Sequence, residues 1–112
     1  MEIQSRVGDD YTTFDIRGRL DAVSASQAEA ALNDAIEAGA SRLVVNLAGL
    51  EYVSSAGLRV VLATAKRLSR RDGKMVLCEL QSGVREVFSM SGLLSILSVA
   101  ESEATAHSLV TA

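Results

Sequence analysis

Tyr52-Val53-Ser54-Ser55-Ala56-Gly57-Leu58-Arg59 is the stretch that decides the fold of this chain. It joins a short apolar run, Arg42 to Leu47, to a long segment with helical spacing. The apolar run has the length and the branched residues of a buried strand, and Gly49 interrupts the connection that follows it. The two adjacent serines are therefore expected where a strand gives way to a helix.

The segment after the serines is predicted to be an amphipathic helix, because apolar and basic residues alternate along it with helical spacing. The apolar positions are Leu58, Val61, Leu62, Ala65 and Leu68, and the basic positions are Arg59, Lys66, Arg67, Arg70 and Arg71. Asp72-Gly73 ends the pattern. The basic positions are explained either as a solvated helix face or as a surface for an acidic partner.

Ser54 or Ser55 then lies at the N-terminus of this helix. Free backbone N–H groups and the positive end of the helix dipole lie there, so a phosphate on Ser55 would meet hydrogen-bond donors and a favourable field. The phosphate would add about 1.5 to 2 negative charges to a small exposed site. The alternative is purely structural, with one serine as the N-cap and the other as a small residue in a turn.

Length and composition are those of an ordinary globular protein. The 112 residues are 48% hydrophobic and 22% charged, which predicts one domain, residues 1–112, with its own core. A formal net charge of −3 gives no general attraction for nucleic acid. No apolar run is long enough to span a membrane and the first residues lack the pattern of a secretory signal, so we expect a cytoplasmic protein without membrane insertion.

The chain before the apolar run is predicted to form a hairpin and then a helix. The hairpin consists of strands over Glu2 to Val7 and Tyr11 to Arg17, with Gly8-Asp9-Asp10 as the turn. In the helix, Ser24 and Gln27 have the spacing of a capping box, and Gly39 supplies the end.

After the basic helix, strand and helix patterns continue to alternate. They predict a strand over Lys74 to Leu80, a helix over Gly83 to Ser91 with Ser82 as its cap, a strand over Ile96 to Val99 and a helix over Glu101 to Val110. Such alternation implies parallel strands with crossover helices, joined here to the antiparallel hairpin. The sequence therefore predicts an α/β fold with a mixed sheet of four to five strands and about four helices.

Few residues are suited to catalysis or metal binding. The single Cys78 lies in an apolar run and is expected to be a packed thiol. Val53 to Gly57 is one residue away from the Gly-x-Ser-x-Gly elbow of hydrolases, but the first glycine is missing and no acid partner is evident for His107, which is expected to be an ordinary residue of the last helix. Because nucleotide-binding motifs are also absent, we expect no enzyme activity, no metal and no cofactor.

In their order and spacing, these segments resemble the STAS domain, and specifically the small bacterial anti-sigma factor antagonists. The similar segments are Gly18 to Ala22, Val44 to Leu47, Tyr52 to Leu58 and Val84 to Leu93, and the resemblance covers nearly the whole chain. In the family pattern an Asp precedes the phosphorylated Ser, which is followed by a Ser or Thr and then by Gly-Leu. Aligned on Gly57-Leu58, the phosphorylated position falls on Ser55.

The chain departs from this pattern at two positions. Ser54 takes the place of the Asp; it is an equivalent N-cap but brings no charge, and it remains an alternative phosphate acceptor. Ala56 takes the place of the second hydroxyl residue. Asp21 matches an acidic position that the family places near the same loop, although turn geometry explains this Asp equally well.

The resemblance implies a partner switch. The unphosphorylated protein would bind an anti-sigma factor that is also a serine kinase and would free the sigma factor, phosphorylation of Ser55 would end that binding, and a serine phosphatase would restore it. The partner-binding residues would be Asp21, Tyr52, Ser54, Ser55, Ala56, Gly57 and Arg59, although Arg59 is also explained as a solvated arginine. The alternative within the same fold is a non-switching regulatory subunit of a membrane transport complex.

Overall fold

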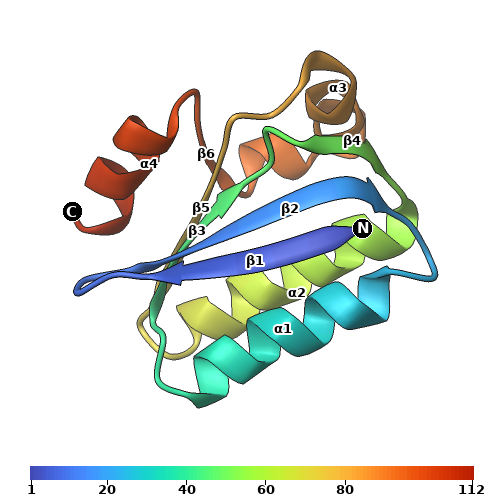
Figure 1. Cartoon of the computed structure of the whole chain (residues 1–112). Coiled ribbons are helices and arrows are strands. Elements are labelled where there is room, and N and C mark those ends of the chain that lie inside the picture. The colour runs from blue at the N-terminus through green and yellow to red at the C-terminus, as the bar shows by residue number, and fades with distance from the viewer.

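The computed structural model describes residues 1–112 and places a six-stranded sheet between helices on its two faces (Figure 1). The strands are β1 (Glu2–Val7), β2 (Thr12–Leu20), β3 (Arg42–Asn46), β4 (Leu50–Val53), β5 (Lys74–Cys78) and β6 (Ser98–Ala100). The helices are α1 (Ala25–Glu37), α2 (Ser55–Ser69), α3 (Ser82–Met90) and α4 (Glu103–Val110), with a 3₁₀ turn η1 (Leu93–Ser95). The predicted α/β fold with a mixed sheet is confirmed.

The sheet runs in the order β1-β2-β3-β5-β6. β1 and β2 form the predicted antiparallel hairpin, and the other neighbours are parallel. β2 changes partner along its length, because Thr12–Asp15 pair with β3 whereas Gly18–Leu20 pair with β4. The β2–β4 pairing shifts register between Gly18 and Arg19, and Gly18 has a φ of 86°, a conformation that costs little only in glycine. The end of β4 consequently lies beside the end of β2, immediately before α2 begins.

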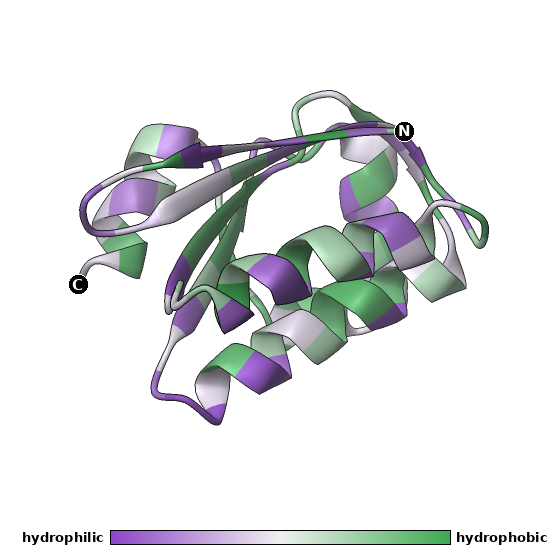
Figure 2. Ribbon diagram, turned by 60° about the horizontal axis from the view of Figure 1, so that its bottom comes forward, coloured by the Kyte–Doolittle hydropathy of each residue, from purple (hydrophilic) through white to green (hydrophobic).

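Two apolar clusters hold the layers together. The larger one fills the space between the sheet and helices α1 and α2, with Phe14 and Leu77 buried in it. The smaller one lies under α4 and includes Val44, Val76 and Ala106. Successive residues of a strand point to opposite faces of the sheet, and both faces are covered at β3 and β5. These two strands therefore need apolar residues at every position, which explains their unbroken apolar runs. Figure 2 shows these hydrophobic strands and the mixed hydropathy of α1 and α2.

Two strand predictions needed correction in the first half of the chain. β2 does not end at Arg17 but continues to Leu20. β4 was not predicted at all, because it has only four residues, of which Leu50 and Val53 are buried and the two between them exposed. Such a short segment carries no readable period, and its pairing with β2 is decided by the fold instead.

Two predictions were also wrong near the C-terminal end. Ser82 is the first residue of α3 and not its cap; the N-cap is Gln81, whose Nε2 donates to the carbonyl oxygen of Ala48 at 2.7 Å. The last strand is Ser98–Ala100 instead of Ile96 to Val99, since the chain first makes the turn η1 and buries Leu97 in the core. Both shifts are two residues or fewer and leave the order of elements unchanged.

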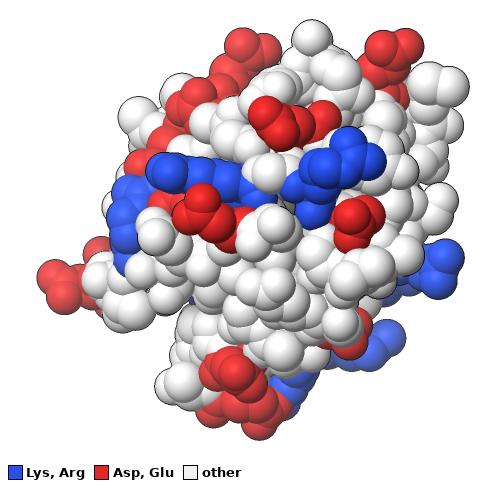
Figure 3. All heavy atoms as spheres, turned by 45° about the vertical axis from the view of Figure 1, so that its right-hand side comes forward, with Lys and Arg blue, Asp and Glu red and all other residues white.

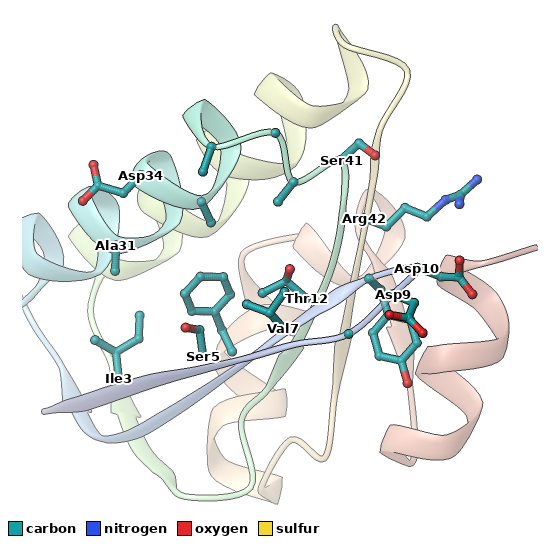
Figure 4. A pocket seen from close by; sticks show the side chains of 17 residues that line it. Ile3, Ser5, Val7, Asp9, Asp10, Thr12, Ala31, Asp34, Ser41 and Arg42 are labelled. Atoms are coloured by element: carbon teal, nitrogen blue, oxygen red, sulfur yellow. The ribbon is translucent and has the colours of Figure 1, made fainter.

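A hollow of about 610 Å³ separates the β1-β2 hairpin from the second half of α1 (Figure 4). Ile3, Ser5 and Val7 of β1 point toward it across from Ala31, and the aspartates of the hairpin turn lie at one end. The short alanine side chains of α1 leave this space open. It lies at the N-terminal ends of the parallel strands, whereas the two serines follow the C-terminal ends.

Cys78 is the packed thiol that the sequence predicted, fully buried under α4. Burial, together with the neighbouring carboxylate of Glu103, raises the pKa of Cys78 to about 12. We expect a disulfide-exchange reagent at pH 8 to label the native protein about a thousandfold more slowly than the urea-unfolded protein, because both the thiolate fraction and access fall. Rapid stoichiometric labelling of the native protein would contradict this burial.

Candidate functional site

Ser54 is the N-cap of α2, which begins at Ser55, as the sequence predicted. Its backbone is extended and its Oγ accepts a hydrogen bond from the backbone N–H of Gly57 at 3.2 Å. The N–H of Ser54 donates to the carbonyl oxygen of Leu20, and its own carbonyl accepts from Leu58, each at 2.9 Å. Ser54 is thus held between the end of β2 and the first turn of α2.

Replacing this cap gives a stability prediction. Ser54→Ala is expected to lower the free energy of unfolding by about 1 kcal/mol, because the N–H of Gly57 loses its acceptor. Ser54→Asp keeps an equivalent acceptor and is expected to leave stability within about 0.5 kcal/mol of the parent. Urea denaturation of the three proteins measures both values, and equal stability of all three would refute the capping role.

Ser55 is the first residue of α2, and its side chain is exposed. Its hydroxyl makes none of the side-chain hydrogen bonds of the structure, and the first turn of the helix has no acidic residue. Of the N–H groups in that turn, the one of Gly57 is taken by the cap. A phosphate on Ser55 would meet the remaining free N–H groups and the positive end of the helix dipole without displacing any contact.

Gly57 allows the start of α2 to lie close to β2. A Cβ at this position would be 2.8 Å from Cγ of Leu20, 2.9 Å from its carbonyl oxygen and 3.0 Å from Cγ2 of Val53. Gly57 is itself buried, so in the free protein it fixes the position of Ser55. Its role as a partner contact stays a prediction. Leu58 is partly buried against the core, as expected.

Asp21 lies in the turn after β2. It directly follows Leu20, whose carbonyl oxygen accepts the hydrogen bond from the N–H of Ser54. Its Oδ1 accepts hydrogen bonds from the backbone N–H groups of Val23 at 3.0 Å and Ser24 at 2.9 Å. The bonds from the backbone and hydroxyl of Ser24 are the main cause that lowers the pKa of Asp21. Because the folded-state pKa is depressed, this stabilisation is present above the unfolded value and is lost as pH falls through the folded one.

The predicted capping box at Ser24 and Gln27 is wrong. Ser24 makes no side-chain bond to the start of α1; its Oγ donates to the carbonyl oxygen of Arg19 at 2.8 Å and accepts from the N–H of Asp21 at 2.9 Å. The chain makes a turn before α1, and Asp21 serves as the acceptor for that turn. Asp21 therefore does have the turn-forming role that the sequence offered as one of two explanations. Its partner-binding role stays a prediction.

Tyr52 is 40% exposed on β4 and lies under Arg19, whose Cζ is 4.1 Å from the ring centroid. The two residues are paired across β2 and β4. A cation over an aromatic face fixes the ring while leaving its hydroxyl edge open to a partner. Sequence reasoning missed Arg19, because without β4 nothing indicated which residue of β2 lies opposite Tyr52.

Arg59 is exposed on α2, one turn after Ser55. With Ala22, Ala25 and Ala56 it lines a hollow of about 560 Å³ between the first turns of α1 and α2. None of the ion pairs of the structure includes Arg59. The structure thus brings all the predicted site residues to one end of the sheet, around the ends of β2 and β4.

His107 does not meet Ser55. It lies on α4, with Nδ1 3.0 Å from the hydroxyl of Tyr11 and Nε2 3.6 Å from a carboxylate oxygen of Glu103. No acid partner was evident for His107 in the sequence, but Glu103 precedes it by one helical turn and its carboxylate approaches Nε2 without a hydrogen bond. Glu103 is also bound by Arg6 and Asn46. The hydroxyl of Ser55 has no such base within hydrogen-bond distance, so the elements of a serine nucleophile are not assembled.

The surface on the side of α2's start carries both charge signs. Figure 3 shows basic and acidic side chains beside one another in the upper part of this face, with a large uncharged area below them. Such a surface lacks the continuous basic field that tracks a nucleic acid backbone. None of the four helices has the length and apolar character needed to cross a membrane.

Comparison with known proteins identifies the family. The model of the STAS domain matches residues 2–106, so the chain belongs to the STAS domain family. One similar protein is BtrV of Bordetella bronchiseptica, whose role as an anti-sigma factor antagonist is inferred. It is 49% identical to this chain over 98 residues, which cover 87% of this chain and 84% of BtrV. The resemblance to anti-sigma factor antagonists is thereby confirmed.

Solved structures agree with this assignment. An inferred anti-sigma factor antagonist from Thermotoga maritima superposes with a TM-score of 0.91 over 96% of this chain and 93% of its own, at 20% identity, which shows the shared fold. The phosphorylated form of the Bacillus cell fate determinant SpoIIAA superposes with a TM-score of 0.74 at 25% identity, over 96% of this chain and 99% of its own. A relative with this fold therefore exists in a phosphorylated form.

Proposed function

We propose that this protein is an anti-sigma factor antagonist that acts by partner switching, with Ser55 as the phosphorylated residue. Its unphosphorylated form binds an anti-sigma factor that is also a serine kinase, and the sigma factor is freed. Phosphorylation of Ser55 ends the binding, and a serine phosphatase restores it. The exchange takes place in the cytoplasm, where sigma factors act, and the protein is substrate and ligand in it, not catalyst.

The observation that carries this proposal is the state of the Ser55 side chain. Its hydroxyl is exposed, makes no hydrogen bond and stands at the start of a helix without an acidic first turn. A kinase can therefore reach it without unfolding the protein, and the phosphate is tolerated afterwards. The relatives named as anti-sigma factor antagonists support the same function.

One phosphate is sufficient to end an interaction of this kind. An unmatched charge buried at an interface costs several kcal/mol, and each 1.4 kcal/mol corresponds to about tenfold in affinity. The binding surface that we propose consists of Asp21, Tyr52, Ser54, Ser55, Ala56 and Arg59, with Gly57 as its support. Arg19 joins it through its contact with Tyr52.

Recovery of the bound partner from the native cells tests the proposal. The Ser55→Ala protein, which cannot accept a phosphate at that position, is used as bait, and the Ser55→Glu protein is the matched control. We expect the alanine bait alone to retain an anti-sigma factor with a kinase fold. Recovery of a transporter ATPase by both baits would instead show a non-switching regulatory subunit of a transport complex.

A further inference from the structure

The first two turns of α2 contain one charged side chain, that of Arg59. It follows Ser55 by four residues, and residues four apart lie on the same face of a helix. Side chains on a helix also lean toward its N-terminus. Helix geometry therefore puts the first turn, the part of α2 that carries Ser55, within reach of the guanidinium of Arg59.

Arg59 is free to take up a new partner. It forms no ion pair, and the neighbouring hollow includes four alanines, whose short side chains leave room for that of Arg59 to turn. Glu29 lines the same hollow but is outside ion-pair distance of Arg59. By contrast, Arg67 farther along α2 pairs with Glu37 of α1, and so does Arg71, which follows the end of the helix.

We propose that Arg59 binds the phosphate of phosphorylated Ser55, an inference that rests on the function proposed above. A guanidinium offers parallel N–H donors that match two oxygens of a phosphate, whereas the free serine hydroxyl gives it no charge to bind. Phosphorylation then changes the binding surface twice. It adds negative charge at Ser55, and it withdraws the positive charge of Arg59 from any acidic group of the partner.

The test measures the ionisation of the phosphate itself. Phosphoserine is installed at position 55 during translation, so that no kinase is needed, and the ³¹P resonance is followed as a function of pH. Four proteins are compared, namely the parent chain, Arg59→Ala, Arg59→Lys and Lys66→Ala. Lys66 lines the same hollow but lies seven residues after Arg59 in α2. Its backbone is therefore about 16 Å from that of Ser55 along the helix axis, beyond the Debye length at physiological salt.

We expect Arg59→Ala to raise the midpoint of the phosphate titration by about 0.2 to 0.4 pH units, the effect of one helix-surface ion pair. Arg59→Lys keeps a charge without the paired donors and is expected to recover part of that shift. Lys66→Ala is expected to leave the midpoint unchanged. An unchanged midpoint in Arg59→Ala, or an equal shift in Lys66→Ala, would overturn the pairing.

The outcomes separate this inference from the proposed function. Arg59 is exposed, so thermal unfolding of the unphosphorylated variants is expected to match that of the parent and to exclude a folding defect. If Arg59→Ala leaves the midpoint unchanged while Ser55→Glu still abolishes partner binding, the switch stands and the pairing fails. If the pairing holds but cells contain no phosphate on Ser55, the proposed function fails instead.

Discussion

Ser55→Glu is expected to weaken binding of the anti-sigma factor by about a hundredfold, whereas Ser55→Ala retains the affinity of the unphosphorylated protein. The glutamate places one unmatched charge in the contact surface, and about 3 kcal/mol of lost binding free energy corresponds to this factor. The alanine removes only a hydroxyl that makes no hydrogen bond in the free protein. Isothermal titration calorimetry with the purified anti-sigma factor measures both affinities.

A matched control separates this effect from a loss of folding. Ser82 is also an exposed first residue of a helix, on α3, outside the proposed binding surface. Ser82→Glu is expected to leave the affinity unchanged. A glutamate at the first position of a helix interacts favourably with the dipole, so neither variant should unfold at a lower temperature than the parent. Undiminished affinity of a folded Ser55→Glu protein would contradict a charge-operated switch.

Gly57→Ala is expected to lower the free energy of unfolding by about 2 kcal/mol, the cost of forcing a methyl group into a closed contact. The added carbon would lie within 3.0 Å of Leu20 and Val53, both buried, so α2 would have to move away from β2. In an open helical position the same change is favourable by up to about 1 kcal/mol, because alanine is the better helix former. The expected loss of stability in Gly57→Ala is thus opposite in sign to the effect of alanine's higher helix propensity.

Gly83 provides the comparison for this variant. It is exposed in the first turn of α3, and a Cβ there would meet nothing within 4 Å. Gly83→Ala is therefore expected to be neutral or stabilising, by at most about 1 kcal/mol. Urea denaturation of the two variants and the parent measures these changes in the free energy of unfolding. Equal gains in stability at both positions would show that α2 does not lie as close to β2 as described.

Most of the fold was predictable from local sequence patterns. The apolar runs of β3 and β5 and the helical spacing of α2 persist over enough residues to be read without knowing their neighbours. β4 was missed because four residues carry too little periodicity, and its strand conformation depends on pairing with Gly18–Leu20. The capping box at Ser24 and Gln27 was wrong for a similar reason: Ser24 is the N-cap residue, but both Asp21 and Ser24 are good acceptors, and the turn that commits their side chains is not readable from spacing.

The candidate site was predictable to the extent that its residues are contiguous. The octapeptide around Ser55 was enough to place the serines at the start of a helix, because the helical spacing begins directly after them. Contacts between distant segments were not readable. Arg19 reaches Tyr52 only through the pairing of β2 with β4, and His107 meets Tyr11 from the other end of the chain. Nothing in the spacing of these residues indicates that they meet.

The central claim is that Ser55 is the residue that carries the phosphate. Phosphopeptide mapping of the protein isolated from its native cells, with fragmentation that separates Ser54 from Ser55, tests it most directly. We predict phosphate on Ser55, because its hydroxyl is exposed and free while that of Ser54 accepts the cap bond from Gly57. Phosphate on Ser54 alone, or none under any growth condition, would contradict the account.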